Sequence, residues 1–327
     1  MDAGKYDQLA NKPQVHYNRR ASSYEEVFKI KPQTSTDSHG NTLRFKPYKG
    51  LKFHPDIPGN VEDQLNDVSS LHLRPDDVLL CSFPKSGTHW VYNMIQMIQT
   101  ESLKYQGTPY MIEFHPSSEI DKLDSPRTLH THLTYPLIPA MAREGKVKIV
   151  HVLRNPKDTI VSYYEHYKRV VGTIYEGDFN GFFNFCLSDE FGLFGGSWFS
   201  YVREWEKAKL SNQKLNVLFL KYEDIKQNLY GTITRLVEFL QLNRPESFLC
   251  EVKTAVEFAN LQKEHETKAG ETKIWNSFGN GGRLPIYRKG CVGDWKNCFT
   301  VAQNEKFDAM LNKEVTEYGI DLNFLYE

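Results

Sequence analysis

The sequence lacks a hydrophobic run long enough to cross a membrane. No stretch of its 327 residues approaches the ~18 consecutive apolar residues that a spanning helix needs. The first residues, MDAGKYDQLANKPQ, also lack the apolar core of a secretory signal. We therefore expect a cytoplasmic protein that has no membrane partner.

Cysteine is scarce, and neither sign of charge predominates. The five cysteines are scattered without a Cys-x-x-Cys pair, which argues against a disulfide framework and a zinc site. The 40 Lys and Arg residues are balanced by 41 Asp and Glu residues, for a net charge of −1. A protein that binds nucleic acid over its whole surface carries a basic excess, so no nucleic-acid partner is expected and any anion site must be local.

Short apolar runs alternate with longer segments of helical periodicity. Strands are predicted at residues 78–83, 147–152 and 216–222. Helices are predicted after Gly87, from Pro156, and over residues 179–187, 198–209, 223–240, 245–258 and 301–318. This order predicts an α/β fold, a single domain over residues 46–327 with a central, mostly parallel sheet flanked by helices. Residues 1–45 are predicted to form a loosely ordered arm, and residues 265–285 a mobile loop.

The first predicted strand leads into a loop that suits an anion. Residues 83–90, FPKSGTHW, place Lys85 and Gly87 between a buried strand and a helix. Backbone N–H groups that open a helix bind anionic oxygens, and Lys85 adds a full charge. The segment is therefore a P-loop-like strand-loop-helix candidate for binding phosphate or sulfate. It is not a Walker A loop, because Lys85 precedes the only glycine, and an ordinary turn with a solvated lysine is the alternative.

Two further basic positions favour the same chemistry. Arg154 stands where the second strand ends, at the edge where open α/β sheets bind ligands, and Ser162 follows about two turns into the next helix. A guanidinium binds phosphate bidentately, although pairing of Arg154 with an acid is the alternative. The cluster Arg288-Lys289-Gly290 adds two cations and a glycine that lets the backbone approach a ligand.

A pair of histidines supplies a candidate base. His130 and His132 lie two residues apart on a segment predicted to be extended, so both side chains point to one face while Thr131 points away. A neutral imidazole, whose usual pKa is about 6.5, accepts the proton of an attacking hydroxyl. Lys85 and the loop N–H groups would stabilise charge on a leaving phosphate. These motifs contain no carboxylate cluster, so no metal is expected.

The segments FPKSGTHW at 83–90 and RKGCVGDWK at 288–296 together resemble the paired cofactor signatures of the cytosolic sulfotransferases. The resemblance runs from about Pro75 to the C-terminus. It implies an enzyme that transfers a sulfuryl group from 3′-phosphoadenosine 5′-phosphosulfate (PAPS) and leaves adenosine 3′,5′-bisphosphate (PAP). The acceptor would be a hydroxyl or amine of a small apolar molecule such as a phenol, a steroid or a retinoid alcohol. A P-loop ATPase or kinase is the neighbouring class, and the order of residues in the loop argues against it.

The resemblance also implies roles for individual residues. The residues that would bind the cofactor are Lys85, Ser86, Gly87, Thr88, His89, Trp90, Arg154, Ser162, Tyr222, Val256, Phe258, Arg288, Lys289 and Gly290. Residues 85–88 would hold the 5′-phosphosulfate, and Trp90 would stack on the adenine. Catalysis would depend on His132 as general base, with Lys85 and His130 beside it. The acceptor would contact Tyr110, His130, Thr131, His132 and His166.

Three residues depart from the family pattern. His130 stands where a lysine is usual beside the base, His89 replaces a threonine, and Val256 replaces a threonine near the adenine. Because a neutral imidazole stabilises negative charge less well than an ammonium group, we expect His130 and His132 to share one proton in the working state. The alternative function is a nucleotide-binding member of the same fold with weak transfer or alcohol-dehydratase activity.

A short pattern near the C-terminus concerns assembly. Lys296, Thr300, Val301 and Glu305 match the family's dimer motif, so the resemblance implies a homodimer formed through residues 296–305. The local alternative is a capping box formed by Thr300 and Gln303 at the start of the last helix. The two interpretations are compatible.

Overall fold

The computed structural model describes residues 32–37, 39–107, 109–169, 174–188, 192–268 and 286–319. Within these ranges, no helix is both long and apolar enough to cross a bilayer. The helices and strands in chain order are β1 (Gln33–Thr36), β2 (Thr42–Tyr48), β3 (Leu51–Phe53), α2 (Val61–Ser70), β4 (Val78–Ser82), α3 (Thr88–Thr100), β5 (Tyr110–Met111), η2 (Ile112–Phe114), α4 (Ser117–Ile120), β6 (Thr128–Thr131), η3 (Tyr135–Leu137), α5 (Ala140–Arg143), β7 (Lys148–Leu153), α6 (Pro156–Tyr167), α7 (Phe179–Leu187), α8 (Trp198–Ser211), β8 (Val217–Lys221), α9 (Tyr222–Gln227), α10 (Leu229–Leu240), α11 (Glu246–Ala255), α12 (Phe258–Lys268), η5 (Asp294–Asn297) and α13 (Val301–Tyr318).

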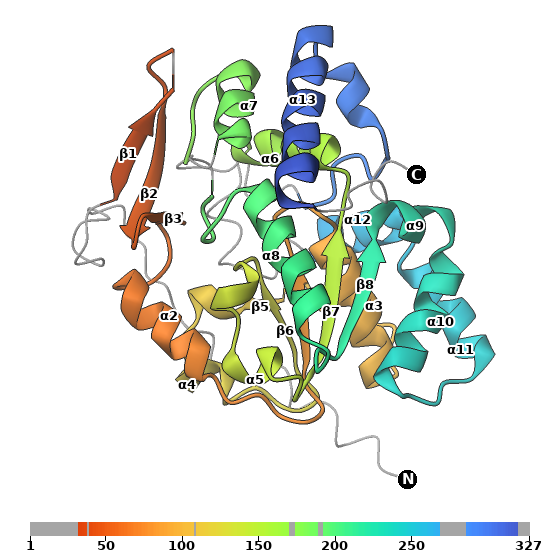
Figure 1. The fold of residues 1–327 in the computed structure, drawn as a ribbon. Helices are drawn as coiled ribbons and strands as arrows, with labels where there is room; N and C mark the ends of the chain where they lie inside the picture. The colour runs from red at the N-terminus through yellow and green to blue at the C-terminus, as the bar shows by residue number, and fades with distance from the viewer. Residues whose placement is uncertain are drawn as a thin grey trace.

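Five strands form a central sheet in the order β5-β6-β4-β7-β8, and every neighbouring pair is parallel (Figure 1). The prediction of an α/β fold with a central, mostly parallel sheet is confirmed. Parallel strands bring their carboxyl ends to one edge of the sheet. β4 ends at Ser82, β6 at Thr131, β7 at Leu153 and β8 at Lys221. The segments that follow these residues therefore meet along a single edge.

Each face of the sheet has its own apolar core. Val78 and Val150 point to one face, where they pack against residues of α3, α10 and α11. Leu79 and Ile149 point to the other face and join a core that includes residues of α7, α8 and α13. This alternation is the two-residue period of a strand, and it explains why the central strands are apolar throughout.

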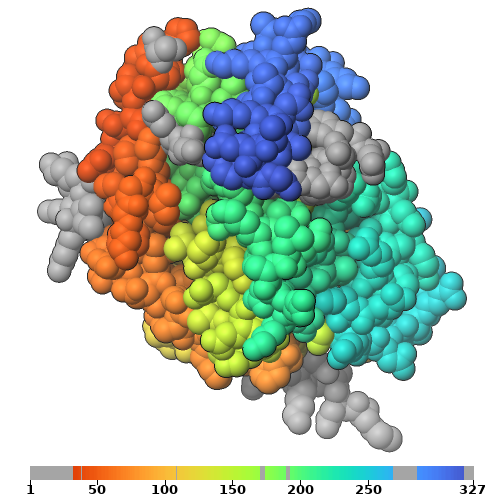
Figure 2. All heavy atoms as spheres, in the orientation of Figure 1, coloured from red at the N-terminus to blue at the C-terminus, as the bar shows by residue number. Residues whose placement is uncertain are grey.

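A second sheet, antiparallel and in the order β1-β2-β3, lies beside the central one. Figures 1 and 2 place it on the opposite side of the molecule from α10 and α11. Isolated bridges from Leu43 to Tyr175 and from Phe53 to Phe194 join it to the segments that precede α7 and α8. These contacts connect the N-terminal sheet to the main body of the fold.

The prediction of a loosely ordered arm over residues 1–45 is wrong for β1 and the start of β2, and the boundary after residue 45 falls inside β2. Leu43 and Phe45 are buried and alternate in sequence with the basic residues Arg44, which is half-buried, and Lys46, which is also buried. Residues 1–31 and 38 lie outside the described residues.

The predicted helices are present, but two of them differ from the expected extent. The helix predicted over 223–240 is two helices, because Asn228 ends α9 and then caps α10 by accepting a hydrogen bond from the backbone N–H of Gly231 at 2.9 Å. The helix predicted over 245–258 ends at Ala255, and Phe258 begins α12. Residues 265–268 of the predicted loop belong to α12, and residues 269–285 lie outside the described residues.

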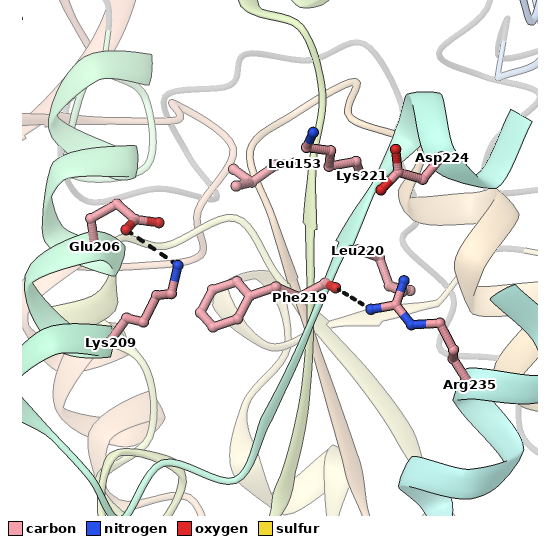
Figure 3. Close-up of a pocket in the computed structure, with 8 residues that line it drawn as sticks. All are labelled: Leu153, Glu206, Lys209, Phe219, Leu220, Lys221, Asp224 and Arg235. Atoms are coloured by element: carbon pink, nitrogen blue, oxygen red, sulfur yellow. Dashed lines mark hydrogen bonds and ion pairs between the residues drawn. The ribbon is translucent and has the colours of Figure 1, made fainter. Parts of the chain in front are cut away.

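β8 is an edge strand of the central sheet, and a groove of about 190 Å³ lies over it (Figure 3). Arg235 reaches the strand from α10 and donates a hydrogen bond to the backbone oxygen of Phe219 at 3.2 Å. Glu206 and Lys209 of α8 line the opposite side of the groove. Arg235 thus occupies an edge carbonyl that another strand would otherwise pair with. None of the site residues predicted from the sequence lines this groove.

Candidate active site

The loop between β4 and α3 turns sharply because two of its residues have left-handed backbone conformations. Lys85 has φ of 69° and Gly87 has φ of 104°. A Cβ atom at position 87 would lie 2.8 Å from the Tyr222 ring, so only glycine allows this approach. Ser86 is fully buried, and its Oγ has no hydrogen-bond partner in the described part of the chain. The loop therefore leaves a polar atom open at the N-terminus of α3, an end that attracts anions.

Lys85 and Arg154 form a compact cationic pair. Arg154 donates hydrogen bonds from Nη1 to the backbone oxygen of Lys85 at 3.1 Å and from Nη2 to that of Cys291 at 3.2 Å. The Nζ atom of Lys85 lies 3.4 Å from Nδ1 of His166. Burial, reinforced by the positive charges of Arg154 and Arg288, lowers the pKa of Lys85 to about 7. Among the described residues no acid forms an ion pair with Lys85 or Arg154, so the pair is suited to an external anion.

A group of aromatic side chains follows this loop. The rings of Trp90 and Tyr222 meet edge to face with centroids 5.4 Å apart. Trp90 is held in place because its indole N–H donates to the backbone oxygen of Val256 at 2.7 Å. The Lys226 ammonium lies 5.4 Å from the Trp90 ring and 5.7 Å from the Phe258 ring. The predicted adenine contacts are thus gathered in one place.

The second basic cluster is paired with an acid that the sequence analysis did not single out. Arg288 and Lys289 donate to the two carboxylate oxygens of Asp294 at 2.8 Å and 2.7 Å. Burial alone would raise the pKa of Asp294, but the hydrogen bonds from Lys289 and Arg288 lower it to about 2. Gly290 has φ of 63°, and a Cβ atom there would lie 2.4 Å from the Phe258 ring. The carboxylate therefore holds both cations beside a backbone segment that only glycine can form.

Asp158 joins this second loop to α6. Its carboxylate accepts the backbone N–H groups of Gly293 at 2.7 Å and Trp295 at 2.9 Å. The ammonium of Lys157 lies 4.5 Å from the Trp295 ring. α6 begins at Pro156, two residues after Arg154, so the Asp158 contacts hold the second loop near Arg154. Nothing in the spacing of the sequence marks Asp158 for this role.

The two candidate histidines face each other at the end of β6. Their ring centroids are 4.3 Å apart, as expected for residues i and i+2 of a strand. Nδ1 of His132 lies 2.6 Å from the backbone oxygen of Ser82. Because a carbonyl can only accept, Nδ1 carries the proton of His132, and Nε2 keeps its lone pair. The Thr131 hydroxyl accepts the Leu133 N–H, and strand alternation places Thr131 on the face away from both imidazoles.

Both imidazoles are neutral at neutral pH. Burial lowers the pKa of His132 to about 3, and burial together with His132 lowers the pKa of His130 well below its usual value. Nε2 of His130 lies 3.4 Å from Nδ1 of His132. Nδ1 of His130 is buried without a partner in the described structure. Burial opposes protonation of both rings here, and the expectation that the pair shares one proton in the working state, with the anionic cofactor bound, stays a prediction.

Three side chains around the base were not singled out from the sequence as individual site residues. The Phe194 ring centroid lies 5.1 Å from that of His132. His54 stacks on Phe194 at 5.7 Å and meets the Phe114 ring edge-on at 5.2 Å. They come from the segments after β3, in η2 and before α8, so only the tertiary fold brings them together. The base therefore faces an aromatic wall.

The remaining predicted residues differ in how closely they approach this centre. Burial and the Lys85 charge lower the pKa of His166 well below its usual value, and burial with Lys85 lowers that of His89 to about 3. Ser162 is half-buried on α6. Tyr110 is 40% exposed on β5. Among the described contacts none joins Ser162 to Arg154 or Tyr110 to His132.

Comparison with known proteins identifies the family. The family described as "Sulfotransferase domain" matches residues 75–319. Sulfotransferase 1C2 of Homo sapiens is 30% identical over 306 residues, which cover 89% of this chain and 99% of that protein. Sulfotransferase 1A1 of Rattus norvegicus is 35% identical over 257 residues, which cover 74% of this chain and 86% of that protein.

Solved structures agree with this assignment. Mouse sulfotransferase SULT7A1 complexed with PAP is 28% identical and superposes with a TM-score of 0.68, covering 83% of this chain and 95% of that chain. Retinol dehydratase in a complex with retinol and PAP superposes with a TM-score of 0.67 over 87% of this chain and 90% of that chain, and at 19% identity it shows likeness of fold alone. The resemblance carried by residues 83–90 and 288–296 is thus confirmed, and the chain belongs to the sulfotransferase family.

Proposed function

We propose that the histidine pair, the loop after β4 and the loop at 288–294 form the active site, with His132 as general base. As a member of its family the protein is a sulfotransferase that uses PAPS as sulfuryl donor and leaves PAP. The observation that supports the choice of base is the contact between His132 and Ser82. Because the Nδ1 proton is committed to that carbonyl, Nε2 is the atom that accepts the proton of an acceptor hydroxyl.

The described residues fit a bisphosphorylated nucleotide. Ser86 Oγ and Arg154 Nε are buried without a partner in the described structure, and Lys85 forms no ion pair with an acid there. Buried donors without acceptors are costly, so a phosphate or sulfate oxygen that accepts from them would stabilise the site. PAPS carries such oxygens at both ends and, when bound, supplies the electrophilic sulfur.

We assign the 5′-phosphosulfate to residues 85–88, where Lys85 and the N–H groups that open α3 would stabilise charge on the leaving phosphate. The 3′-phosphate is assigned to Arg154, Ser162, Arg288, Lys289 and Gly290, and the adenosine to Trp90, Tyr222, Val256 and Phe258, with His89 beside the loop. The Arg154 guanidinium lies 4.3 Å from the centroid of the Tyr222 ring. It therefore stands between the groups proposed to bind the two ends of the nucleotide.

The acceptor proposed for this site is a small apolar molecule with a hydroxyl or amine. The proposal is supported by the aromatic side chains of Phe114 and Phe194 beside His132. His130 and His166 are proposed as further acceptor contacts, and Tyr110 as a contact at the rim. A flat ring that packs on these groups would bring its hydroxyl to Nε2 of His132.

Transfer of labelled sulfate tests this function. The full chain is incubated with PAPS labelled in its sulfuryl group and, separately, with a phenol, a steroid and a retinoid alcohol. The expected product is a labelled sulfate ester, formed equally well with excess chelator, and the groove variant Lys209→Ala is the control with unchanged rate. PAP binding without any labelled ester, or a dehydrated alcohol in its place, would favour the alternative function. A rate that falls with chelator and is restored by magnesium would overturn metal-free transfer.

We also propose a homodimer formed through residues 296–305, in the cytoplasm. Val301, within this segment, is 78% exposed in the single chain, so a large apolar side chain is uncovered there. The capping box of Thr300 and Gln303 is present as well, and it leaves Val301 available. All five cysteines are free thiols, which is compatible with a reducing compartment. Sedimentation equilibrium of the wild type and of Val301→Glu tests the dimer, and an unchanged mass would contradict it.

A further inference from the structure

Glu113 is a buried carboxyl directly behind the proposed base. It lies in η2 with 0% exposure, and its Oε1 accepts the backbone N–H of His132 at 2.8 Å. The Thr131 hydroxyl lies beside the carboxyl and favours its charged form, and among the described residues no cation forms an ion pair with Glu113. Burying a carboxyl without a cation costs free energy, so a buried carboxyl at this place suggests that it serves a role that offsets the loss of stability.

The contact lies where the regular sheet ends. The last residue of β6 paired with β4 is Thr131, opposite Cys81. The N–H of His132 follows that pairing, and a buried backbone N–H needs an acceptor. Glu113 supplies the acceptor from its side chain. The backbone of His132 is therefore held by a side-chain hydrogen bond just past the last residue pair of β4 and β6.

The same short 3-10 turn also supports the ring of His132. Phe114 meets Phe194 edge-on at 6.2 Å, and Phe194 meets the His132 ring at 5.1 Å. On its other side the imidazole donates from Nδ1 to Ser82. The backbone contact, the aromatic contact and the Nδ1 contact together leave the ring little freedom to rotate.

We propose that Glu113 is a positioning residue of the transfer reaction. Its carboxyl oxygen fixes the backbone of His132, so that the Nδ1 proton stays on Ser82 and the Nε2 lone pair faces the acceptor hydroxyl. This inference rests on the proposed function of His132 as base. Glu113 does not touch the substrate and does not take its proton. Burial raises the pKa of Glu113 to about 7, and a carbonyl-type oxygen remains available to the His132 N–H in either protonation state.

Two substitutions separate positioning from other roles. Glu113→Gln keeps an oxygen that accepts the His132 N–H, so kcat should stay within about threefold of the wild-type value. Glu113→Met removes that acceptor at similar volume, and kcat should fall by about 100-fold, while the KM for the acceptor and the Kd for PAP change by less than about twofold. Should Glu113→Met fail to fold, Glu113→Asp, which withdraws the carboxyl by one methylene, takes its place.

The matched control is Glu314→Met. Glu314 is likewise a buried carboxyl, 7% exposed on α13, where it pairs with Arg203 at 3.0 Å away from the histidines. Its loss should lower thermal stability and leave kcat unchanged. Wild-type kcat in Glu113→Met, or an equal loss in Glu113→Gln and Glu113→Met, would overturn the proposal. A parallel fall of PAP affinity in Glu113→Met would do the same, because it would show general damage to the site.

A spectroscopic measurement decides the same point without any transfer. In protein labelled with ¹⁵N in histidine, long-range proton–nitrogen correlation reports which ring nitrogen of His132 carries the proton, with His132→Gln providing the assignment. The Nδ1–H form is expected in the wild type and in Glu113→Gln, and a mixture of tautomers in Glu113→Met. An unchanged tautomer in Glu113→Met would refute positioning. A wild-type protein that forms no sulfate ester would instead refute the proposed function, and the tautomer measurement would still test Glu113.

Discussion

The low pKa of Lys85 makes cofactor binding depend on pH in a measurable way. Burial and the charges of Arg154 and Arg288 bring this pKa to about 7, far below the usual range of a lysine. A phosphate group placed beside Lys85 favours the ammonium form and raises the pKa again. Binding of PAP must therefore be accompanied by uptake of a proton, since the protein binds the nucleotide best with Lys85 charged.

The magnitude follows from the fraction of Lys85 that is charged before binding. With a pKa of about 7, that fraction is about one half at pH 7 and about one hundredth at pH 9. If only the charged form binds, PAP affinity falls by about 50-fold between these pH values, or about 2.3 kcal/mol. Proton uptake rises from about 0.5 per PAP at pH 7 to about 0.9 at pH 8. The second ionisation of a phosphate, near pH 6, is complete over this range and adds little.

Isothermal titration calorimetry measures both quantities. The Kd for PAP is determined from pH 7 to pH 9 in pairs of buffers with different ionisation enthalpies, so that the difference in heat counts the protons taken up. Lys85→Arg is the matched variant, because a guanidinium stays charged throughout this range. We expect its PAP affinity to be nearly independent of pH.

A constant Kd from pH 7 to pH 9 with no proton uptake would refute the reasoning, because it would place the pKa of Lys85 well above 9 in the free protein. A pH dependence that persists unchanged in Lys85→Arg would also refute it. In that event another group, rather than Lys85, would take up the proton. The imidazoles of His130 and His132 titrate at lower pH in the free protein, so they cannot account for a change above pH 7.

Three further substitutions test the site. His132→Ala should lower transfer by about 10²–10⁴-fold with PAP affinity unchanged, and near-normal turnover with a phenol would exclude it as the base. Arg288→Ala should weaken PAP binding in calorimetry, and an unchanged Kd would remove Arg288 from the phosphate site. Asp158→Ala leaves the N–H groups of Gly293 and Trp295 without their charged acceptor, so the free energy of unfolding in urea should fall by about 3 kcal/mol. An unchanged unfolding midpoint would show that the second loop holds its position without Asp158.

The sequence could single out the loops proposed to bind the cofactor because their chemistry is local. Lys85, Gly87 and the helix that follows them occupy consecutive positions, and Arg154 directly follows a buried strand. The tertiary contacts gave no such signal. Glu113 accepts a hydrogen bond from the backbone N–H of His132, and Asp158 accepts one from that of Gly293. A backbone N–H can donate to any acceptor side chain that the fold brings near. No residue type at position 132 or 293 marks those partners in advance.

The fold could be predicted where one hydrophobic pattern dominated a segment. The prediction failed where the hydrophobic pattern and the overall composition of a segment pointed to different structures. Buried strands such as β4 and β7 are apolar throughout, so they stand out. In β2 the alternation of Leu43 and Phe45 is mixed with basic residues and Pro47, and the surrounding polar composition suggested an arm. Lys46 is fully buried there because its ammonium donates to backbone oxygens of Ile57 and Gly59, which composition cannot show.

A histidine at position 130 adds no permanent cation to a site that already holds Lys85, Arg154 and Arg288. Arg154 and Arg288 both lower the pKa of Lys85, so the positive charges already present in this region oppose protonation of Lys85. A second lysine at position 130, buried at 0% exposure, would add a further cation and lower the pKa of Lys85 again. A neutral imidazole avoids that repulsion and keeps one N–H donor. With a neutral imidazole at position 130, we expect charge stabilisation during transfer to depend on Lys85, whose pKa of about 7 makes its charge sensitive to pH near neutrality.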